Sequence, residues 1–434
     1  MNIPFTQFTL ANGLRVIIHE DRRLPMVAVN LWYHVGSKNE HPGRTGFAHL
    51  FEHLMFEGSQ HYDKGYFHPL QEAGAALNGS TNADRTNYWE VVPTNALDLA
   101  LWMESDRMGY LLPALTMQKF ETQREVVLNE RRQNYENRPY GLATSAILAA
   151  LFPSDHPYHW MTIGETADLN AATFDDVRDF FRTYYHPANA SLVVAGDVDT
   201  ADVFERVRAH FEDIPPGPAP APVQPVAVLE SERRLLLEDR IELPRLYLAW
   251  HSPAMFTSGD AELDLVSDLF SNGKVSRLYK SLVYERRIAS EVMAFQNSRE
   301  LAGFWQVVAT AAPGHSLEAV EKGIDEEMDR LSQEGPTPDE MERGHAQIEA
   351  QFVYRLQTLG GFGGKADQLN AYSVFVNDPG YFARDLARYE SVTAGDLHQA
   401  VRKHLRKENR VALSVVPKGN LALALPHSTP AVVS

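Results

Sequence analysis

A proline-rich segment near the middle of the chain divides it into two halves. Residues 214–225 read Ile-Pro-Pro-Gly-Pro-Ala-Pro-Ala-Pro-Val-Gln-Pro. Prolines at this density exclude a regular helix or a central strand and favour an extended, semi-rigid connector. A chain of 434 residues is also longer than one hydrophobic core usually supports. We therefore predict an N-terminal domain at 1–214, a linker at 215–228 and a C-terminal domain at 229–434.

The two halves repeat the same order of predicted elements, which indicates a tandem duplication. In the first half a strand-like pair precedes a helix and a closing strand, at 8–20, 26–35, 46–56 and 190–195. In the second half the corresponding elements fall at 234–237, 245–252, 261–270 and 410–416. Alternating strands and amphipathic helices predict an α+β or α/β domain in each half, with apolar strands packed under helices.

The charge and the apolar runs exclude two classes of partner. The formal net charge is −17, which repels nucleic acid and anionic membranes. The longest apolar stretch, 143–152, ends at Pro153 and is about half of the roughly 20 residues that a membrane span needs. We expect no membrane span and a soluble protein. No secretory signal is visible at the N-terminus, so a cytoplasmic and a periplasmic location both stay open.

The chain contains no cysteine, and this restricts its chemistry. Disulfides, thiolate nucleophiles and thiolate metal ligands are excluded. A metal ion would have to be held by histidine and carboxylate side chains.

Two histidines and a glutamate share one face of a predicted helix. The segment 46–58 reads Gly-Phe-Ala-His-Leu-Phe-Glu-His-Leu-Met-Phe-Glu-Gly. His49 and His53 are four residues apart, so both rings project from the same side of a helix and lie close enough to share a metal ion. Glu52 lies beside them, where it could act as a general base. The His-x-x-Glu-His order is the inverzincin signature, although the five residues alone also fit a half-buried helix with hydrogen-bonded histidines.

A catalytic zinc ion usually has three protein ligands and an open position, so a third ligand must come from another element. The best candidate is Glu130, in the predicted helix 120–132, which follows His53 by 77 residues.

These motifs make the chain resemble the pitrilysin and insulinase family, which includes the mitochondrial processing peptidases and their bacterial relatives. The resemblance rests on His-x-x-Glu-His followed at this distance by a glutamate in Val-Val-Leu-Asn-Glu, residues 126–130. It implies an α+β fold of two homologous domains that form a bowl-shaped half of a peptidase chamber. It also implies one zinc ion per chain, held by His49, His53 and Glu130. Glu52 would activate the zinc-bound water, and unfolded peptides would be the substrates of a metalloendopeptidase.

The resemblance extends to residues around this centre, with two departures. The family usually has a glutamate seven residues before the ligand glutamate, where this chain has Gln123; its amide could still orient a ligand by hydrogen bonding. The family also pairs the substrate backbone with an Asn-Ala-x-Thr strand. Here that element is Asn78, Gly79, Ser80 and Thr81, with glycine in place of alanine, and the same letters also fit an ordinary turn.

The second half has lost the metal-binding pattern. Alignment of Gly58 with Gly273 places Asp264, Ser267 and Asp268 at the positions of the two histidines and the base, so we expect the C-terminal domain to be metal-free.

An arginine and a tyrosine seven residues apart contact the substrate in the family's second domain. This chain has Lys365 and Tyr372, and lysine lacks the planar fork of arginine. The same two residues also fit a structural tyrosine and a solvated lysine. The resemblance therefore implies a homodimer, or a heterodimer whose homologous partner supplies an Arg/Tyr pair. The alternatives to an active enzyme are a non-catalytic core or scaffold subunit and a zinc subunit that is active only when paired.

Overall fold

The computed structural model describes residues 2–223, 229 and 231–433, so residues 224–228 of the predicted linker lie outside the described part. The strands are β1 (Thr6–Thr9), β2 (Arg15–Glu20), β3 (Met26–Tyr33), β4 (Ala76–Thr81), β5 (Thr86–Pro93), β6 (Ala190–Gly196), β7 (Arg233–Asp239), β8 (Arg245–Ser252), β9 (Ala289–Asn297), β10 (Gly303–Ala311), β11 (Arg410–Pro417) and β12 (Thr429–Pro430). The α-helices are α1 (Phe47–Leu54), α2 (Phe67–Glu72), α3 (Leu97–Ala114), α4 (Met117–Arg131), α5 (Ala143–Leu151), α6 (Thr166–Ala171), α7 (Phe174–Tyr184), α8 (Thr200–Phe211), α9 (Asp260–Ser271), α10 (Leu317–Glu334), α11 (Pro338–Arg355), α12 (Lys365–Phe375), α13 (Phe382–Glu390) and α14 (Ala394–His404).

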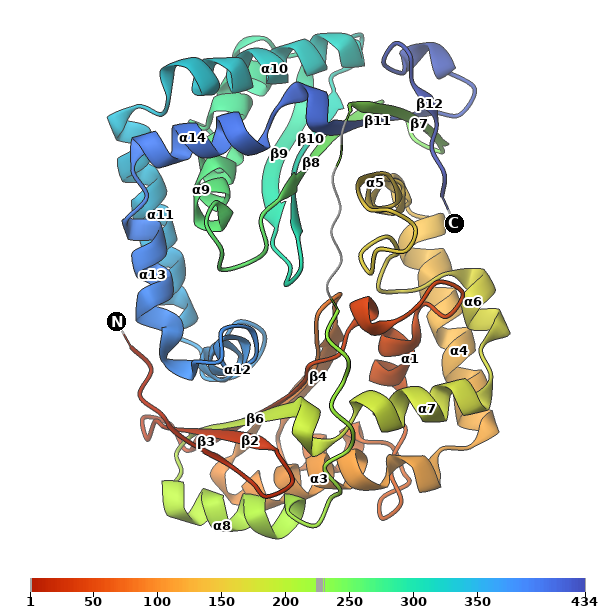
Figure 1. Ribbon diagram of the computed structural model, residues 1–434, viewed down its shortest axis with the longest axis vertical. Coiled ribbons are helices and arrows are strands. Elements are labelled where there is room, and N and C mark those ends of the chain that lie inside the picture. The colour runs from red at the N-terminus through yellow and green to blue at the C-terminus, as the bar shows by residue number, and fades with distance from the viewer. Residues whose placement is uncertain (1, 224–228, 230, 434) are drawn as a thin grey trace. The chain divides into compact units, whose positions relative to one another are not determined.

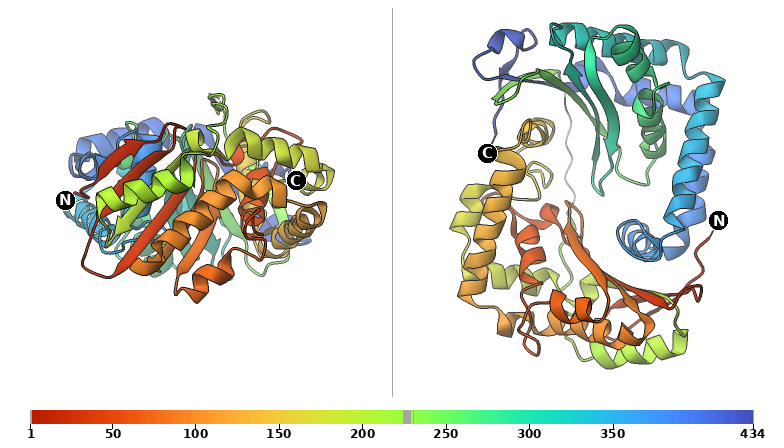
Figure 2. Two further views of the ribbon diagram at one scale, coloured as in Figure 1. Left: turned by 90° about the horizontal axis from the view of Figure 1, so that it is seen from below. Right: turned by 180° about the vertical axis from the view of Figure 1, so that it is seen from behind.

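The first sheet has the strand order β1-β2-β6-β3-β5-β4. Strands β2 and β6 run parallel, and the other neighbours are antiparallel. Strand β6 is buried along its whole length, which explains its continuous apolar sequence. Helices α3 and α8 cover one face of this sheet; they lie over its strands in the view from below in Figure 2. Strand β4, which follows α1 and α2, forms one edge of the sheet.

The second sheet has the order β12-β7-β11-β8-β10-β9 and repeats this arrangement except at its edge strand β12, which runs parallel to β7. The parallel pair β7–β11 corresponds to β2–β6, and the antiparallel run β11-β8-β10-β9 corresponds to β6-β3-β5-β4. Trp250 and Trp305 are fully buried in its core, with ring centroids 5.6 Å apart. The predicted α+β fold of two related halves is confirmed.

The two compact units exchange one helix each. The first unit comprises 1–129, 160–223 and 351–384, and the second comprises 130–159, 224–350 and 385–434. Helix α12, from the second half of the sequence, packs on β3 and β6 of the first sheet, on the face opposite α3 and α8 (Figure 1). Helix α5, from the first half, packs on β8 and β11 of the second sheet. The units therefore differ from the contiguous domains predicted at 1–214 and 229–434, because each sheet buries its second face under the other half's helix.

The first predicted strand is interrupted. The stretch 8–20 forms two strands, β1 and β2, joined by a turn in which Gly13 N donates to Leu10 O over 2.9 Å. Gly13 has φ +90°, a conformation that glycine adopts at little cost.

No helix in the described part of the chain is both long and apolar enough to cross a membrane.

Candidate metal centre

Helix α1 presents the His-x-x-Glu-His motif on its less buried face. Its apolar side chains, Phe47, Ala48, Leu50, Phe51 and Leu54, are fully buried and fix the rotation of the helix. His49, Glu52 and His53 lie on the other face and are half-buried. The two imidazole rings have centroids 4.9 Å apart, as expected for an i, i+4 pair on one helix face.

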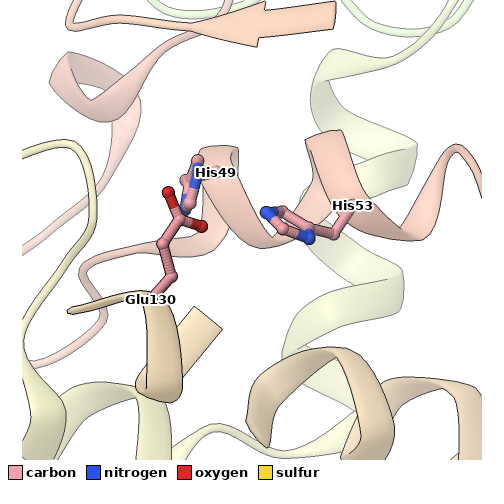
Figure 3. A group of neighbouring side chains, drawn as sticks. All are labelled: His49, His53 and Glu130. Carbon is pink, nitrogen blue, oxygen red and sulfur yellow. The ribbon is translucent and has the colours of Figure 1, made fainter. Parts of the chain in front are cut away.

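Helix α4 brings Glu130 to the two histidines. One ligand atom each from His49, His53 and Glu130 lies within 4.8 Å of the others, and the Glu130 carboxylate faces the His49 ring in Figure 3. The division between the two units falls directly before Glu130, but α4 continues unbroken to Arg131, so Glu130 is held by this helix. Two imidazoles and one carboxylate are a donor set that suits zinc and leaves a coordination position for solvent. The three residues therefore fit the ion that the sequence predicts.

The cation Arg85 lies within electrostatic reach of Glu52. Burial lowers the pKa of the Arg85 guanidinium, and the carboxylates of Asp367, Glu52 and Asp84 oppose that shift, in decreasing order. Arg85 Nη1 donates to Ser80 O over 2.9 Å and to Ser80 Oγ over 2.7 Å. The proposed base and strand β4 thus share a positively charged neighbour.

A buried carboxylate caps the start of α1. Glu40 is 4% exposed, and its two oxygens accept hydrogen bonds from Gly46 N at 2.9 Å and Ala48 N at 2.8 Å. Burial raises the pKa of Glu40 to about 8, against the opposing effect of these N–H donors. Gly46, the N-cap residue, has φ +89° and no side chain to cap the helix. Glu40 replaces that missing cap from six residues earlier in the chain.

Replacement of Glu40 by alanine should destabilise the first unit. Near pH 4.5 we expect the free energy of unfolding to fall by about 2–6 kcal/mol, because two buried N–H donors each lose a partner worth about 1–3 kcal/mol. The loss should shrink as the pH rises towards 8, because the raised pKa of Glu40 makes its burial increasingly costly over that range. Urea unfolding followed by tryptophan fluorescence, in the presence of EDTA, measures this change without a contribution from metal.

Glu20 is a matched control, since it accepts from Thr200 N over 2.9 Å at the start of α8 but is 41% exposed. Glu20→Ala should cause a much smaller loss, because water replaces the exposed acceptor. Equal losses in the two variants would contradict the role given to Glu40.

Gln123 lies beside the loop that follows α1. Its Nε2 donates to Glu57 Oε1 over 2.6 Å, four residues after His53. The hydrogen bond shows that α4 is tied to the end of the motif. That Gln123 orients a metal ligand stays a prediction.

Strand β4 presents an open edge of the first sheet near α1. Its pairing with β5 sets Ser80 opposite Asn87, and Asn82 N donates to Arg85 O over 3.0 Å at the turn between the strands. Hydrogen-bonded pairs alternate along an antiparallel ladder, so Asn78 and Ser80 bond to β5. The backbone groups of Gly79 and Thr81 then point towards the open edge.

Gly79 lies where a side chain would be crowded. A Cβ at this position would lie 3.0 Å from ring atoms of both Phe56 and Tyr88. Either ring would have to move to admit alanine.

Lys365 and Tyr372 do not form an exposed pair. Both are on α12 in the first compact unit, and their exposed fractions are 6% and 2%. Lys365 Nζ donates to Asp21 Oδ2 over 2.6 Å. The resemblance implied a substrate contact for this pair. Both side chains are buried here, so the solvated lysine that the sequence also allowed is excluded, and contact of the pair with substrate stays a prediction.

The second half carries different residues on the helix that corresponds to α1. Helix α9 also starts after a glycine with positive φ, Gly259, at +97°. Alignment of Gly46 with Gly259 places Glu262, Leu265 and Val266 at the positions of His49, Glu52 and His53, in place of Asp264, Ser267 and Asp268. Neither alignment retains an imidazole pair or a base. That the second domain takes no metal stays a prediction.

Comparison with protein-family models matches both halves of the chain. Residues 15–157 match the model described as insulinase, peptidase family M16. Residues 171–348 match the model described as the peptidase M16 inactive domain. The first match contains all four residues of the predicted centre.

Individual relatives agree with these models. The chain is 30% identical to the zinc protease PqqE of Helicobacter pylori over 356 residues, which cover 81% of this chain and 80% of that protein. The crystal structure of a protease from Helicobacter pylori superposes with a TM-score of 0.89 at 26% identity, covering 96% of this chain and all of that one. A peptidase M16 inactive domain from Pseudomonas fluorescens shares the fold, with a TM-score of 0.85 at 18% identity over 99% of this chain and 100% of that one.

Proposed function

Because the chain belongs to the insulinase family of peptidases, family M16, we propose that it is a zinc-dependent endopeptidase that hydrolyses unfolded peptides. The observation that carries the proposal is the approach of His49, His53 and Glu130 to within 4.8 Å of one another. Two of these residues lie on α1 and the third lies on α4. A chance cluster of surface carboxylates would not contain two histidines on one helix face.

Each residue of the centre has a distinct proposed role. His49, His53 and Glu130 would hold the ion. When bound, zinc polarises a carbonyl oxygen and lowers the pKa of a neighbouring water. Glu52 takes the proton of the attacking water and returns a proton to the leaving amine. Arg85 adds positive charge beside Glu52, which favours the ionised carboxylate before the proton is taken.

The edge of β4 is the proposed binding site for the peptide backbone. An extended peptide would pair with the N–H and C=O groups of Gly79 and Thr81 and add a strand to the first sheet. Backbone pairing does not depend on side chains, and it requires an extended segment. This explains why unfolded peptides would be cut and folded proteins spared.

The direct test is metal content together with hydrolysis. We expect the purified chain to carry one zinc ion and to cleave an unfolded, fluorogenic peptide. Chelation should abolish cleavage and added zinc should restore it. A chain that holds no zinc and cleaves nothing would instead be a non-catalytic core or scaffold subunit.

A second candidate, a zinc subunit that needs a partner, is favoured by the burial of Lys365 and Tyr372. Because both side chains are buried, α12 of this chain does not present an exposed pair of this kind. A homologous chain would supply the Arg/Tyr pair. Stoichiometric zinc without cleavage by the isolated chain would indicate this arrangement. The compartment in which the protein acts, cytoplasm or periplasm, stays a prediction.

A further inference from the structure

A single carboxylate on α12 holds two strands of the first sheet. Asp367 is 9% exposed, and its Oδ1 accepts from Trp32 Nε1 on β3 at 2.9 Å and from Asn87 Nδ2 on β5 at 3.1 Å. Its Oδ2 accepts from Gly363 N, at the start of the same helix, at 2.8 Å. Three donors from three segments converge on one buried group, so its position is strongly determined.

The hydrogen bonds continue from this carboxylate to strand β4. Asn87, which is fully buried, accepts from Ser80 Oγ over 2.7 Å with its Oδ1. Ser80 in turn accepts from Arg85 at its Oγ and its main-chain oxygen. A connected path therefore leads from α12 through Asn87 to Ser80, the residue between Gly79 and Thr81.

This path reaches β4 at Ser80, between the two residues whose backbone groups face the open edge of the sheet. Gly79 and Thr81 direct their backbone groups outward only while Ser80 keeps its register opposite Asn87. An edge strand lacks a neighbour on one side, so its register is weakly held by the ladder alone. Side-chain hydrogen bonds from the interior supply the missing constraint.

We propose that Asp367 is a positioning residue, which acts through Asn87 and Ser80 to hold β4 ready to pair with a peptide backbone. The inference rests on the proposed function, because it takes β4 as the peptide-binding strand. Its consequence is that a helix from the second half of the sequence controls peptide binding on the first sheet.

The test combines hydrogen exchange with kinetics on Asp367→Asn and Ser80→Ala. In Asp367→Asn the amide nitrogen faces an N–H donor, so at least one of the three hydrogen bonds is lost. We expect backbone amides of 76–81 to exchange at least about 10-fold faster in both variants, since local opening of the strand becomes easier. KM for a long extended peptide should rise about 10-fold, with kcat changed less than 3-fold and zinc content unaltered.

Asn370→Ala is the matched control. Asn370 lies on the same helix, is fully buried, and its Nδ2 donates to Asn30 O and Oδ1 on β3, both at 2.8 Å. It anchors α12 to β3, and in the described part of the chain its side-chain hydrogen bonds reach Asn30 and not β4. We expect its exchange rates at 76–81 and its KM to stay near those of the unaltered chain.

Two outcomes would overturn the inference. One is faster exchange at 76–81 in Asn370→Ala equal to that in Asp367→Asn, which would show general loosening of α12. The other is additive effects in the Asp367→Asn/Ser80→Ala double variant, because residues in one network should be coupled. Hydrogen exchange is measured without substrate or turnover. The effect of Asp367 on β4 can therefore be tested even if the chain has no peptidase activity.

Discussion

Glu52→Gln is expected to lower kcat by about 100- to 10,000-fold, the usual contribution of a general base, while zinc content stays unchanged. Glutamine has nearly the same shape but cannot accept a proton at neutral pH. Because Glu52 is half-buried and is not among the three converging ligand residues, the fold and the metal centre should persist. Peptide cleavage at saturating substrate and elemental analysis give the two measurements.

Glu125→Gln serves as the control, since Glu125 is an exposed carboxylate on α4. It removes the same charge from the same region and should retain full turnover. If Glu52→Gln cleaved peptide as fast as this control, Glu52 could not be the base.

Glu130→Gln should weaken zinc binding at least about 100-fold, more than the 10- to 100-fold that loss of an outer partner of a ligand produces. The amide keeps one oxygen but loses the negative charge that attracts the cation. Competition with a chromogenic chelator measures the dissociation constant directly, without reference to activity. Glutamine retains the hydrogen bond that Asn134 donates to Glu130 Oε1 over 3.4 Å, so the end of α4 should stay helical.

The same Glu125→Gln variant separates ligation from general electrostatics. Loss of a nearby negative charge on α4 should change zinc affinity only a few-fold, because exposed charges are screened. Equal affinities in Glu130→Gln and the unaltered chain would exclude Glu130 as a ligand.

The sequence predicted the elements that carry strong local patterns. The helix expected at 46–56 is α1, Phe47–Leu54, and the strands expected at 245–252 and 410–416 are β8 and β11, with almost the same bounds. The approach of Glu130 to the two histidines was also predicted, although the distance of 77 residues alone does not bring them together. The family resemblance supplied that step.

Long-range packing could not be read from local patterns. Helix α12 carries polar residues such as Lys365 and Asn370 that are buried, so its sequence does not indicate which sheet it packs on. The grouping of Lys365 and Tyr372 with the first compact unit could therefore not be predicted, and their contact with substrate stays a prediction. Glu40 and Asp367 were missed for a related reason. A carboxylate at these positions looks like a surface residue in the sequence, and only the three-dimensional contacts show that backbone or side-chain N–H groups surround it.

The exchange of α5 and α12 makes the two halves of the gene product interdependent during folding. When only the first half of the chain has been synthesised, the first sheet still lacks α12, which packs on one of its faces. At the same stage α5 is present, but the second sheet on which it packs is not. Neither sheet can therefore reach its final packing before both halves of the chain have been synthesised. Shuffling of one half between related genes would have to preserve two helix–sheet fits at once, which ties the evolution of the metal-bearing half to that of its duplicate.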